Sequence, residues 1–479
     1  MSSDQFASKG LRVPSGRLSR IARFGNMATG IAGSMLLDGA KQLVSGRKPS
    51  VSELLMTPAN ALRVTLQLGQ MRGAAMKLGQ LVSMDTGDFL PPELTDIFAR
   101  LRADAQHMPP GQLSMVLTRH WGKDWRSQFI RFDDKPIAAA SIGQVHRALT
   151  LDNQDVAIKV QYPGVRRSID SDVGNVATLL RLSTVLPKTL DITNLLTEAK
   201  RQLHEEADYA CEGDYLKRFG DLLADDAGYA VPAFYAPLSG KNVLAMSFIE
   251  SVPIESMITA PQAERDRIMT LLIELVLREL FEFRLMQTDP NFANYRYDEK
   301  SRQVVLLDFG ATRVLPETVV TQYRTLLNKG LAGDKQGVLA AVLDIGFMNG
   351  QTAQQNRYEI DKLIGTAIAM IQLPGPFDFS RTDFVTDIRD DGMAIAADRR
   401  NWHIPPSDTL FVQRKLGGIF SLASRLKARV DVNGMLKRYI YKVVKRRHPQ
   451  LLNEPSYRQK RLVIVKTVAG LSPENRVEA

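Results

Sequence analysis

Cysteine is nearly absent from this chain of 479 residues, in which Cys211 is the single example. One cysteine excludes internal disulfides and fits a reducing compartment. Cys211 directly precedes Glu212, and we predict that it is a small packed residue rather than a nucleophile. The 6 histidines show no metal-ligand spacing, and the sequence contains no internal repeat or low-complexity tract.

Long apolar runs are also missing, since crossing a bilayer takes about 20 consecutive apolar residues. Met27–Leu37 stops at Asp38, and Ile268–Met286 is interrupted by charged residues that include Glu279. We therefore interpret Ile268–Met286 as an amphipathic helix of a helical lobe, and we expect any membrane association to be peripheral. The hydrophobic share of 44% is ample for a globular core.

The net charge of +10 is concentrated partly at the two ends of the chain, and no acidic residue lies between Gln5 and Leu37. A basic chain can bind nucleic acid or an anionic membrane. No recognised nucleic-acid motif is present, which favours an anionic membrane surface and no nucleic acid as the partner. Each basic residue close to such a surface contributes about 1 kcal/mol.

The most informative feature present is a pair of motifs in the second half of the sequence. Asp289 and Asn294 lie five positions apart, and Asp308 begins an Asp-Phe-Gly sequence shortly after them. Between them, Tyr295–Tyr297 and Val304–Leu307 flank a polar turn, which predicts a hairpin that returns Asp308 to the side of Asn294. Magnesium prefers hard oxygen ligands, and one or two protein groups plus phosphates suffice.

Asn294 and Asp308 are therefore the predicted magnesium ligands, and Asp289 is predicted to orient an attacking hydroxyl or water. Asp-Phe-Gly alone is a weak signal, but its coupling to D-x-x-x-x-N upstream makes it more specific. The alternative is that Asp308-Phe-Gly310 merely closes a buried strand with a turn.

Such a site also needs a lysine on a strand to hold the phosphates and a glutamate to hold the lysine. The sequence Val156-Ala-Ile-Lys159 provides the lysine. Side chains alternate faces along a strand, so Ala157 and Lys159 share the face opposite Val156, Ile158 and Val160. The alternative for Lys159 is an ordinary solvated lysine.

The glutamate is expected on the next substantial helix, which we predict over Thr193–Phe219. An acidic run is usually a solvated face. Composition alone does not choose among the acidic residues of this segment: Glu198, Glu205, Glu206, Asp208, Glu212 and Asp214.

The segment Ile137–Gln144 stands where a kinase places its glycine-rich nucleotide loop, yet Gly143 is the single glycine in it. Alanine lacks the access of glycine to positive φ, so this loop is expected to be stiffer. On the residues alone, the segment also fits a small-residue turn between strands.

Asn60–Met84 is predicted to be a helix, because its apolar residues recur near helical spacing. Lys77 and Gln80 lie three positions apart and project on a common face. Gly73 and Gly79 each cost about 1 kcal/mol of helix stability relative to alanine, which suggests a close backbone approach. The alternative is an ordinary solvated Lys/Gln face.

Several of these segments together resemble the UbiB family of atypical protein-kinase-like ATPases, which are associated with coenzyme Q biosynthesis in bacteria and mitochondria. The resemblance is closest to the mitochondrial coenzyme Q branch and runs from about Val13 through Arg429. It rests on the following sequences: Lys77-Leu-Gly-Gln80, Ala138-Ala-Ala-Ser141, Glu206-Ala-Asp208, Phe281-Glu-Phe283, Gln287-Thr-Asp-Pro-Asn291, Pro376-Phe-Asp-Phe379 and Lys415-Leu-Gly-Gly418.

The resemblance implies roles that composition leaves open. It implies that Glu212 is the glutamate that pairs with Lys159. It also implies that the Lys77–Gln80 segment packs over the site and faces Glu206 and Asp208. Lys77, Gln80, Glu206 and Asp208 would then restrict the substrate site. It also implies that an alanine-rich loop replaces the glycine-rich nucleotide loop, with the residues Ala138, Ala139, Ala140 and Ser141.

The chain departs from ordinary protein kinases, because no H-R-D precedes Asp289 and no A-P-E follows Gly310. Protein phosphotransfer is therefore doubtful. The resemblance implies binding and hydrolysis of ATP with Mg²⁺, in support of ubiquinone biosynthesis, with a small or lipid molecule as an alternative phosphate acceptor. The other hypotheses are a nucleotide-switched pseudokinase that acts as a scaffold or lipid-extracting chaperone, and a true protein kinase.

The implied partners are quinone-biosynthesis enzymes or lipid intermediates at an anionic membrane surface, and a homodimer stays open. Because the resemblance begins by about Val13, little room is left for a cleaved transit peptide. We therefore favour a bacterial cytoplasmic protein that is peripherally membrane-associated, with the matrix side of mitochondria as the alternative.

The predicted fold class is α+β, a two-lobed protein-kinase-like fold with a helical N-terminal extension. The extension covers residues 1–130, the small lobe 131–250 and the helical large lobe 251–479. Val243–Ile249 is predicted to form the last strand of the small lobe and the hinge, where the backbone of Ser247, Phe248 and Ile249 contacts adenine.

Overall fold

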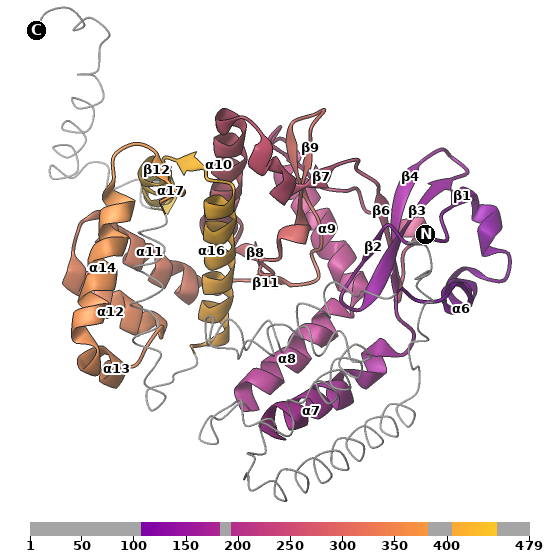
Figure 1. The fold of residues 1–479 in the computed structure, drawn as a ribbon, viewed down its shortest axis with the longest axis horizontal. Helices are drawn as coiled ribbons and strands as arrows, with labels where there is room; N and C mark the ends of the chain where they lie inside the picture. The colour runs from indigo at the N-terminus through magenta and orange to yellow at the C-terminus, as the bar shows by residue number, and fades with distance from the viewer. Residues whose placement is uncertain (1–106, 183–192, 382–404, 448–479) are drawn as a thin grey trace, which may run out of the picture.

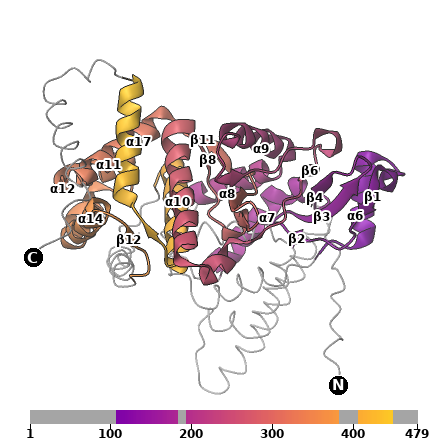
Figure 2. The ribbon, with the colours of Figure 1, turned by 90° about the horizontal axis from the view of Figure 1, so that it is seen from above.

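The structure, a computed structural model, describes residues 107–182, 193–381 and 405–447. Strands β1–β4 and β6 lie at one end of the molecule and helices α11–α14 at the other, as Figures 1 and 2 show. The predicted helix Asn60–Met84, with Lys77 and Gln80, lies outside the described residues. Within the described ranges, no helix combines the length and apolar character that a bilayer crossing requires.

The strand-rich lobe is built on an antiparallel five-stranded sheet. Along the sheet the order is β1 (Phe129–Phe132), β3 (Gly143–Thr150), β4 (Asp155–Gln161) and β6 (Val243–Ser247), and β2 (Ala138–Ala139) pairs with β3. The predicted boundary at residue 130 falls within β1, which joins this sheet.

One face of β4 supplies the core of this lobe, because strand residues alternate sides. Val156, Ile158 and Val160 are fully buried, as the alternation predicts. They share a core cluster with residues of α6 (Pro110–Trp121) and with Trp125 of η2 (Trp125–Gln128). The chain just before the sheet is therefore packed into the same lobe.

Three helices follow β4: α7 (Val165–Leu182), α8 (Thr193–Glu206) and α9 (Tyr209–Leu223). The prediction of one helix over Thr193–Phe219 is wrong, because Asp208 interrupts it. The Asp208 carboxylate accepts a hydrogen bond from the Cys211 backbone N at 3.3 Å and caps a new helix. Aspartate is preferred at such N-caps because it satisfies a free N–H.

The prediction of a packed Cys211 is also wrong, since this residue is exposed.

A second, four-stranded sheet lies in the other lobe, in the order β5 (Tyr229–Ala230), β10 (Gln303–Leu306), β9 (Tyr295–Asp298) and β7 (Val252–Pro253). The predicted hairpin is confirmed, because β9 and β10 pair antiparallel. A separate pair joins β8 (Leu285–Gln287) to β11 (Thr312–Val314). The 3-10 turns η4 (Ile254–Thr259) and η6 (Phe292–Asn294) complete this region, whereas η3 (Ala236–Leu238) packs against β6 of the strand-rich lobe.

The prediction that Ile268–Met286 is one helix is correct only for its first part. The α-helix α10 (Gln262–Arg278) ends in a π turn, η5 (Glu279–Phe283). Arg284 then adopts a positive φ of 51°, and Leu285–Gln287 becomes strand β8. Pairing with β11 overrides the local helical pattern here, as tertiary context often does.

The large lobe is mainly helical, and α10 lies beside α16 (Ser407–Arg425) in its core (Figure 1). The buried apolar residues of α10, α16, β8 and β9 form one cluster with the aromatic Phe309. The remaining elements surround this core: α11 (Glu317–Leu331), α12 (Lys335–Ile345), α13 (Gly350–Gln355), α14 (Arg357–Gln372), β12 (Phe377–Asp378), β13 (Arg429–Val430) and α17 (Val432–Arg447).

Candidate active site

Strand β4 places Lys159 on the face of the sheet opposite Val156 and Ile158, with only 5% of its surface exposed. The Lys159 Nζ lies 2.8 Å from Oε1 and 3.0 Å from Oε2 of Glu212. The ammonium is therefore held by both oxygens of one buried carboxylate. This contact joins the sheet to α9.

Helix α9 holds Glu212 in its first turn, where a carboxylate is favoured by the helix macrodipole. Glu212 is 2% exposed, and the cap on Asp208 fixes where its helix begins. The break between α8 and α9 therefore orients the glutamate that faces Lys159.

The hairpin β9–β10 returns the chain to Asn294, since Leu306 pairs with Tyr295 and the Leu307 N donates to the Asn294 O at 2.8 Å. Asp308 follows with φ of +61°, a conformation that aspartate tolerates better than most residues. Its Oδ2 lies 3.3 Å from the Lys159 Nζ, and its Oδ1 accepts from the Gly310 N at 3.2 Å.

Asp289 lies at the start of the same loop and is partly exposed. Its backbone O accepts a hydrogen bond from the Asn294 Nδ2 at 3.4 Å, and its Oδ1 accepts from the Asn291 N at 3.3 Å. The Asn294 bond uses the amide nitrogen, which leaves Oδ1 as the side-chain oxygen for a cation. The predicted triad of Asp289, Asn294 and Asp308 thus occupies one continuous loop and hairpin.

Phe309 fixes the orientation of the Asp-Phe-Gly segment from the other side. It is 2% exposed, and its ring centroid lies 4.9 Å from that of Phe219 on α9. The helix that carries Glu212 therefore also packs against the residue next to Asp308. Movement of α9 would change both contacts together.

The charges around Lys159 do not balance. A β-carbon at Gly310 would lie 3.4 Å from the Asp308 Oδ1, 3.5 Å from the Glu212 Oε2 and 3.6 Å from the Glu206 Cα, so the three acidic residues surround one small volume. The Lys159 ammonium is thus paired with two carboxylates, those of Glu212 and Asp308.

Burial raises the pKa of Glu212 to about 7, an effect that Asp308 and Glu206 reinforce and Lys159 opposes. The pKa of Lys159 is raised well above its usual value, because Asp308 and Glu212 outweigh the opposing effect of burial. The cluster of Lys159, Glu212 and Asp308 has an excess of negative charge and therefore favours an additional cation.

The alanine-rich loop is anchored to Glu206 at the end of α8. Ala138 and Ala139 are exposed in β2, and the Ala140 N donates to the Gly143 O at 2.9 Å. The Ser141 hydroxyl then donates to the Glu206 Oε1. Glu206 is 8% exposed, so a buried acid holds the tip of the loop.

Gly143 is required by close packing rather than by its φ. A β-carbon there would lie 2.5 Å from the Val160 O and 2.7 Å from the Tyr209 hydroxyl. Tyr209 is 1% exposed, and its ring centroid lies 5.2 Å from the Lys159 Nζ. The single glycine of this loop therefore lets the sheet approach α9.

Asp208 points to a different neighbour, since its Oδ2 lies 3.3 Å from the Arg166 Nη2 on α7. The two acids of the E-x-D sequence therefore have different contacts, Glu206 with the alanine-rich loop and Asp208 with α7. Lys77 and Gln80, predicted to face them, lie outside the described residues and stay predictions.

The predicted hinge begins at the end of β6. The Ser247 N donates to the Ala233 O and the Phe248 N to the Asp155 O, both at 2.8 Å. The Phe248 ring lies 4.0 Å below the Arg147 guanidinium. The backbone N–H groups of Ser247 and Phe248 are therefore already hydrogen-bonded within the lobe. Contact between adenine and the backbone of Ser247, Phe248 and Ile249 stays a prediction.

Sequence reasoning missed a buried group beneath this loop, formed by Glu279, Gln287 and Lys415. The Gln287 Nε2 donates to the backbone O of Asp308 at 3.2 Å, and the Lys415 Nζ donates to the Gln287 Oε1 at 3.0 Å. Gln287 and Lys415 each lie in a sequence that carries the family resemblance, and Glu279 lies inside an apolar segment, but none of these signals joins the three residues. The sequence pattern predicts that Glu279 interrupts an apolar run in an amphipathic helix, whereas the structure buries this acid.

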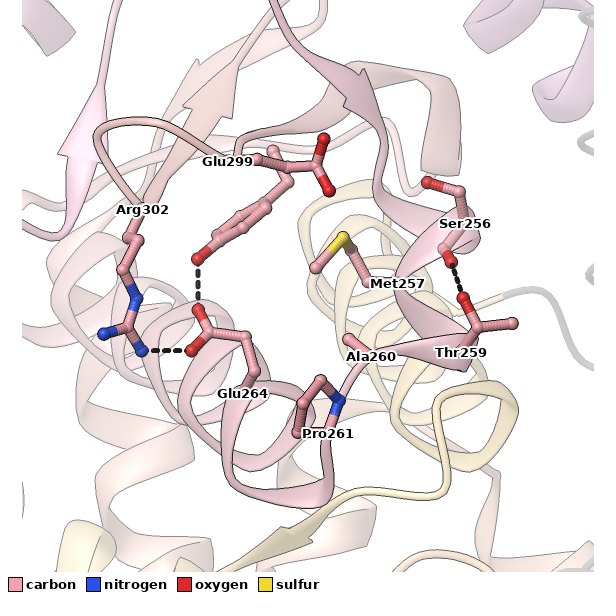
Figure 3. A pocket seen from close by; sticks show the side chains of 9 residues that line it. Ser256, Met257, Thr259, Ala260, Pro261, Glu264, Glu299 and Arg302 are labelled. Carbon is pink, nitrogen blue, oxygen red and sulfur yellow. Dashed lines mark hydrogen bonds and ion pairs between the residues drawn. The ribbon is translucent and has the colours of Figure 1, made fainter.

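A cavity of about 480 Å³ lies away from these residues, at the start of α10. Figure 3 shows Glu264 on its wall, bonded to Arg302 and to the tyrosine of β9. None of the predicted site residues lines this cavity.

Comparison with known proteins places these observations in a family. Residues 100–342 match the model of the ABC1 atypical kinase-like domain. The chain is 36% identical over 435 residues to the atypical kinase COQ8B, mitochondrial, of Danio rerio, covering 89% of this chain and 69% of that protein. It is 34% identical over 441 residues to the atypical kinase COQ8, mitochondrial, of Saccharomyces cerevisiae, covering 91% and 87%.

The solved structure of the Rv3197–erythromycin complex from Mycobacterium tuberculosis is also similar, with a TM-score of 0.58 and 25% identity. It covers 81% of this chain and 97% of that chain. Together with the family match, it confirms the predicted α+β, protein-kinase-like fold. The two curated relatives are named as mitochondrial proteins, so they do not support the expectation of a bacterial cytoplasmic protein.

Proposed function

Because the chain belongs to the ABC1/UbiB family of atypical kinase-like proteins, in its coenzyme Q branch, we propose that it binds Mg-ATP between its lobes and hydrolyses it in support of coenzyme Q biosynthesis. The family makes the chain an atypical kinase or ATPase, with the acceptor of the phosphate unassigned. The observation that carries the proposal is the position of Lys159, between Glu212 at 2.8 Å and Asp308 at 3.3 Å.

The residues present fit a magnesium–nucleotide group in charge and in donor type. Asn294 and Asp308 provide hard oxygens, which are the ligands that Mg²⁺ prefers, and phosphates complete such a site. Glu212 and Asp308 are both paired with the single ammonium of Lys159, so a divalent cation would neutralise their excess negative charge. When bound, magnesium neutralises charge that develops on the phosphates.

Each predicted site residue then has its own role. Lys159 binds phosphate oxygens while Glu212 holds its ammonium in place. Asp289 accepts a proton from, or orients, the water or small lipid hydroxyl that attacks. The Ser141–Glu206 hydrogen bond holds the alanine-rich loop against the site, and we assign this loop, Lys77, Gln80 and Asp208 to restriction of the substrate site.

The Ser141–Glu206 bond also favours a second candidate, in which the protein is a nucleotide-switched scaffold or lipid-extracting chaperone. A loop tied to a buried acid is poorly suited to rapid rearrangement during turnover. Peripheral binding to an anionic membrane is part of both proposals, and the excess of basic residues supports it.

The test is ATP hydrolysis by the full chain with magnesium, with and without vesicles that contain anionic phospholipid. We expect turnover to rise with vesicles and to be lost in Asp308→Asn. Asp225→Asn removes the same charge at an exposed position and is expected to retain turnover. Parental turnover in Asp308→Asn would show that the site is misassigned.

Absence of turnover in the parental chain, together with thermal stabilisation by nucleotide, would favour the scaffold. The link to coenzyme Q is tested in a strain that lacks the corresponding protein. Restoration of quinone by the parental chain and Asp225→Asn, but not by Asp308→Asn, is the expected result. Restoration by all three chains would show that catalysis is not needed for quinone synthesis.

A further inference from the structure

A second cavity, of about 340 Å³, lies on the strand-rich lobe and has no assigned role. It is enclosed by the end of α6, the turn after β4, the start of α7 and the turn before β6. None of the residues predicted to bind nucleotide or metal lines it. The lining residues are Val116, Arg119, His120, Gln161, Tyr162, Pro163, Gly164, Arg166, Arg167, Lys241 and Asn242.

The charge of this cavity has one sign. Its wall carries Arg119, Arg166, Arg167 and Lys241, and it includes no aspartate or glutamate. Among the residues that the structure describes, Arg166 is paired with Asp208, whereas Arg119, Arg167 and Lys241 have no carboxylate within 4.0 Å. The three cations without a carboxylate partner, Arg119, Arg167 and Lys241, repel one another around a pocket of this size, and an anion that enters would relieve this repulsion.

The start of α7 adds to this positive potential. A helix N-terminus carries about half a positive charge, and acidic residues are therefore favoured in the first turn. Helix α7 has no acid there and instead carries Arg166 and Arg167. This arrangement is unfavourable for an isolated helix and favourable for a phosphate, which helix N-termini bind readily.

The cavity is also rigid on two sides. The Gln161 N donates to the Asn242 O at 3.0 Å, and the Gln161 Nε2 donates to the Ala207 O at 3.1 Å. Gly164 turns the chain into α7 with φ of +78°. These bonds fix the turn after β4 against the turn before β6 and against Ala207 at the end of α8, and a volume of about 300 Å³ or more is typical of ligand pockets.

From the cavity, its charge and its rigid frame, we infer that this pocket binds a phosphate group, carried either by a free phosphate compound or by the headgroup of an anionic phospholipid. Guanidinium groups are suited to phosphate because they donate two parallel hydrogen bonds. We call the four residues Arg119, Arg166, Arg167 and Lys241 the basic pocket. This site is separate from the proposed ATP site and does not depend on it.

Arg166 connects the basic pocket to the E-x-D sequence, because its Nη2 lies 3.3 Å from the Asp208 Oδ2. A phosphate on Arg166 would compete with Asp208 for the same guanidinium. Asp208→Asn removes the competing charge and keeps an oxygen that can cap α9. This variant is therefore expected to bind phosphate more tightly than the parental chain.

The experiment is a calorimetric titration of the full chain with pyrophosphate at low salt and without magnesium. We expect Arg119→Gln/Lys241→Gln to weaken binding by about tenfold or more, since each lost cation removes a charge-assisted hydrogen bond. Lys123→Gln/Lys217→Gln removes the same charge at exposed positions outside the pocket and is the matched control. Any pyrophosphate bound at the ATP site is common to all these variants.

A second assay distinguishes the two sources of phosphate. The chain is sedimented with phosphatidylcholine vesicles, with and without a fraction of phosphatidic acid. The pocket variant is Arg119→Gln/Lys241→Gln. If it loses binding to the vesicles but keeps binding to pyrophosphate, the ligand is a lipid headgroup. If it loses binding to pyrophosphate but keeps binding to the vesicles, the ligand is a free phosphate compound. If the pocket variant matches the control variant in both assays, or the parental chain binds neither probe, the inference is wrong.

Discussion

Lys415 and Glu279 form an ion pair in which both side chains are 1% exposed, with the Nζ 3.1 Å from the Oε2. Lys415 also donates to Gln287, and Gln287 donates to the backbone O of Asp308. The ion pair therefore supports, through one glutamine, a backbone that adopts positive φ at a predicted metal ligand. Helix α16 thus connects to the Asp-Phe-Gly segment by hydrogen bonds as well as by packing.

Removal of one member of this pair should destabilise the protein strongly. Lys415→Met leaves the Glu279 carboxylate buried without its cation, which typically costs about 3–5 kcal/mol. Urea unfolding should show this loss, whereas Lys437→Met, an exposed lysine on α17, should change stability by less than about 0.5 kcal/mol. The double variant Lys415→Met/Glu279→Gln should recover part of the loss, because no unpaired charge is left. A double variant as unstable as the sum of the two single ones would contradict the pairing.

Lys159→Met should remove catalysis and lower the stability of the protein. A second substitution, Glu212→Gln, should restore part of the stability but none of the catalysis. The substitution removes the group proposed to bind phosphate, and loss of one such electrostatic contact typically lowers turnover by about 10²–10³. Lys159→Met/Glu212→Gln should unfold at a temperature closer to that of the parental chain, yet turn over no faster. The checks are the hydrolysis rate and a thermal unfolding curve, with Lys217→Met on the exposed side of α9 as the control. Turnover restored in the double variant would contradict the assignment of Lys159.

The features that could be predicted from the sequence are those set by short spacings. The hairpin behind Asn294 and the two faces of β4 follow from local alternation, and both are confirmed. The choice of Glu212 among six acids needed the family resemblance. Lys415 and Glu279 could not be paired from sequence, because they are separated by 136 positions.

The break at Asp208 was missed for a different reason. The sequence pattern of Thr193–Phe219 predicts one helix. In the structure the Cys211 N donates a hydrogen bond to the Asp208 side chain, and this N-cap begins a second helix. Such a cap depends on the path that the chain takes around Glu206, which is fixed by contacts with the alanine-rich loop. Local propensity does not contain that information.

Alanine at Gly143 and at Gly220 should have opposite effects on stability. A β-carbon at Gly143 would meet the Val160 O at 2.5 Å, and overpacking of this kind typically costs about 1–3 kcal/mol. Gly220 lies in α9, and a β-carbon there has nothing within 4 Å. Gly220→Ala should therefore stabilise the protein by about 0.4–1 kcal/mol. Denaturant unfolding measures both, and a stable Gly143→Ala would show that β3 does not approach the Val160 O of β4 so closely.

Glu264 should make the stability of the protein sensitive to acid. Partial burial alone would raise its pKa, but hydrogen bonds from Arg302, Tyr297 and Arg267 lower the pKa of Glu264 from 4.5 to about 2. Figure 3 shows the bond between Glu264 and Arg302. A carboxyl group with a lowered folded-state pKa stabilises the protein above its unfolded pKa. That stability is lost as the pH falls from about 4.5 toward 2, because the unfolded state binds the proton first.

The free energy of unfolding should therefore fall less steeply with acid in Glu264→Gln than in the parental chain over this pH range. Glu299→Gln is the matched control, because Glu299 lines the same cavity but is exposed. The measurement is urea unfolding at several pH values between 2 and 6. Equal slopes for Glu264→Gln and the parental chain would show that the three donors do not hold the carboxylate in solution. A reduced slope in Glu264→Gln alone would establish that this cluster joins the start of α10 to the β9–β10 hairpin, which carries Asn294 at one end and leads to Asp308 at the other.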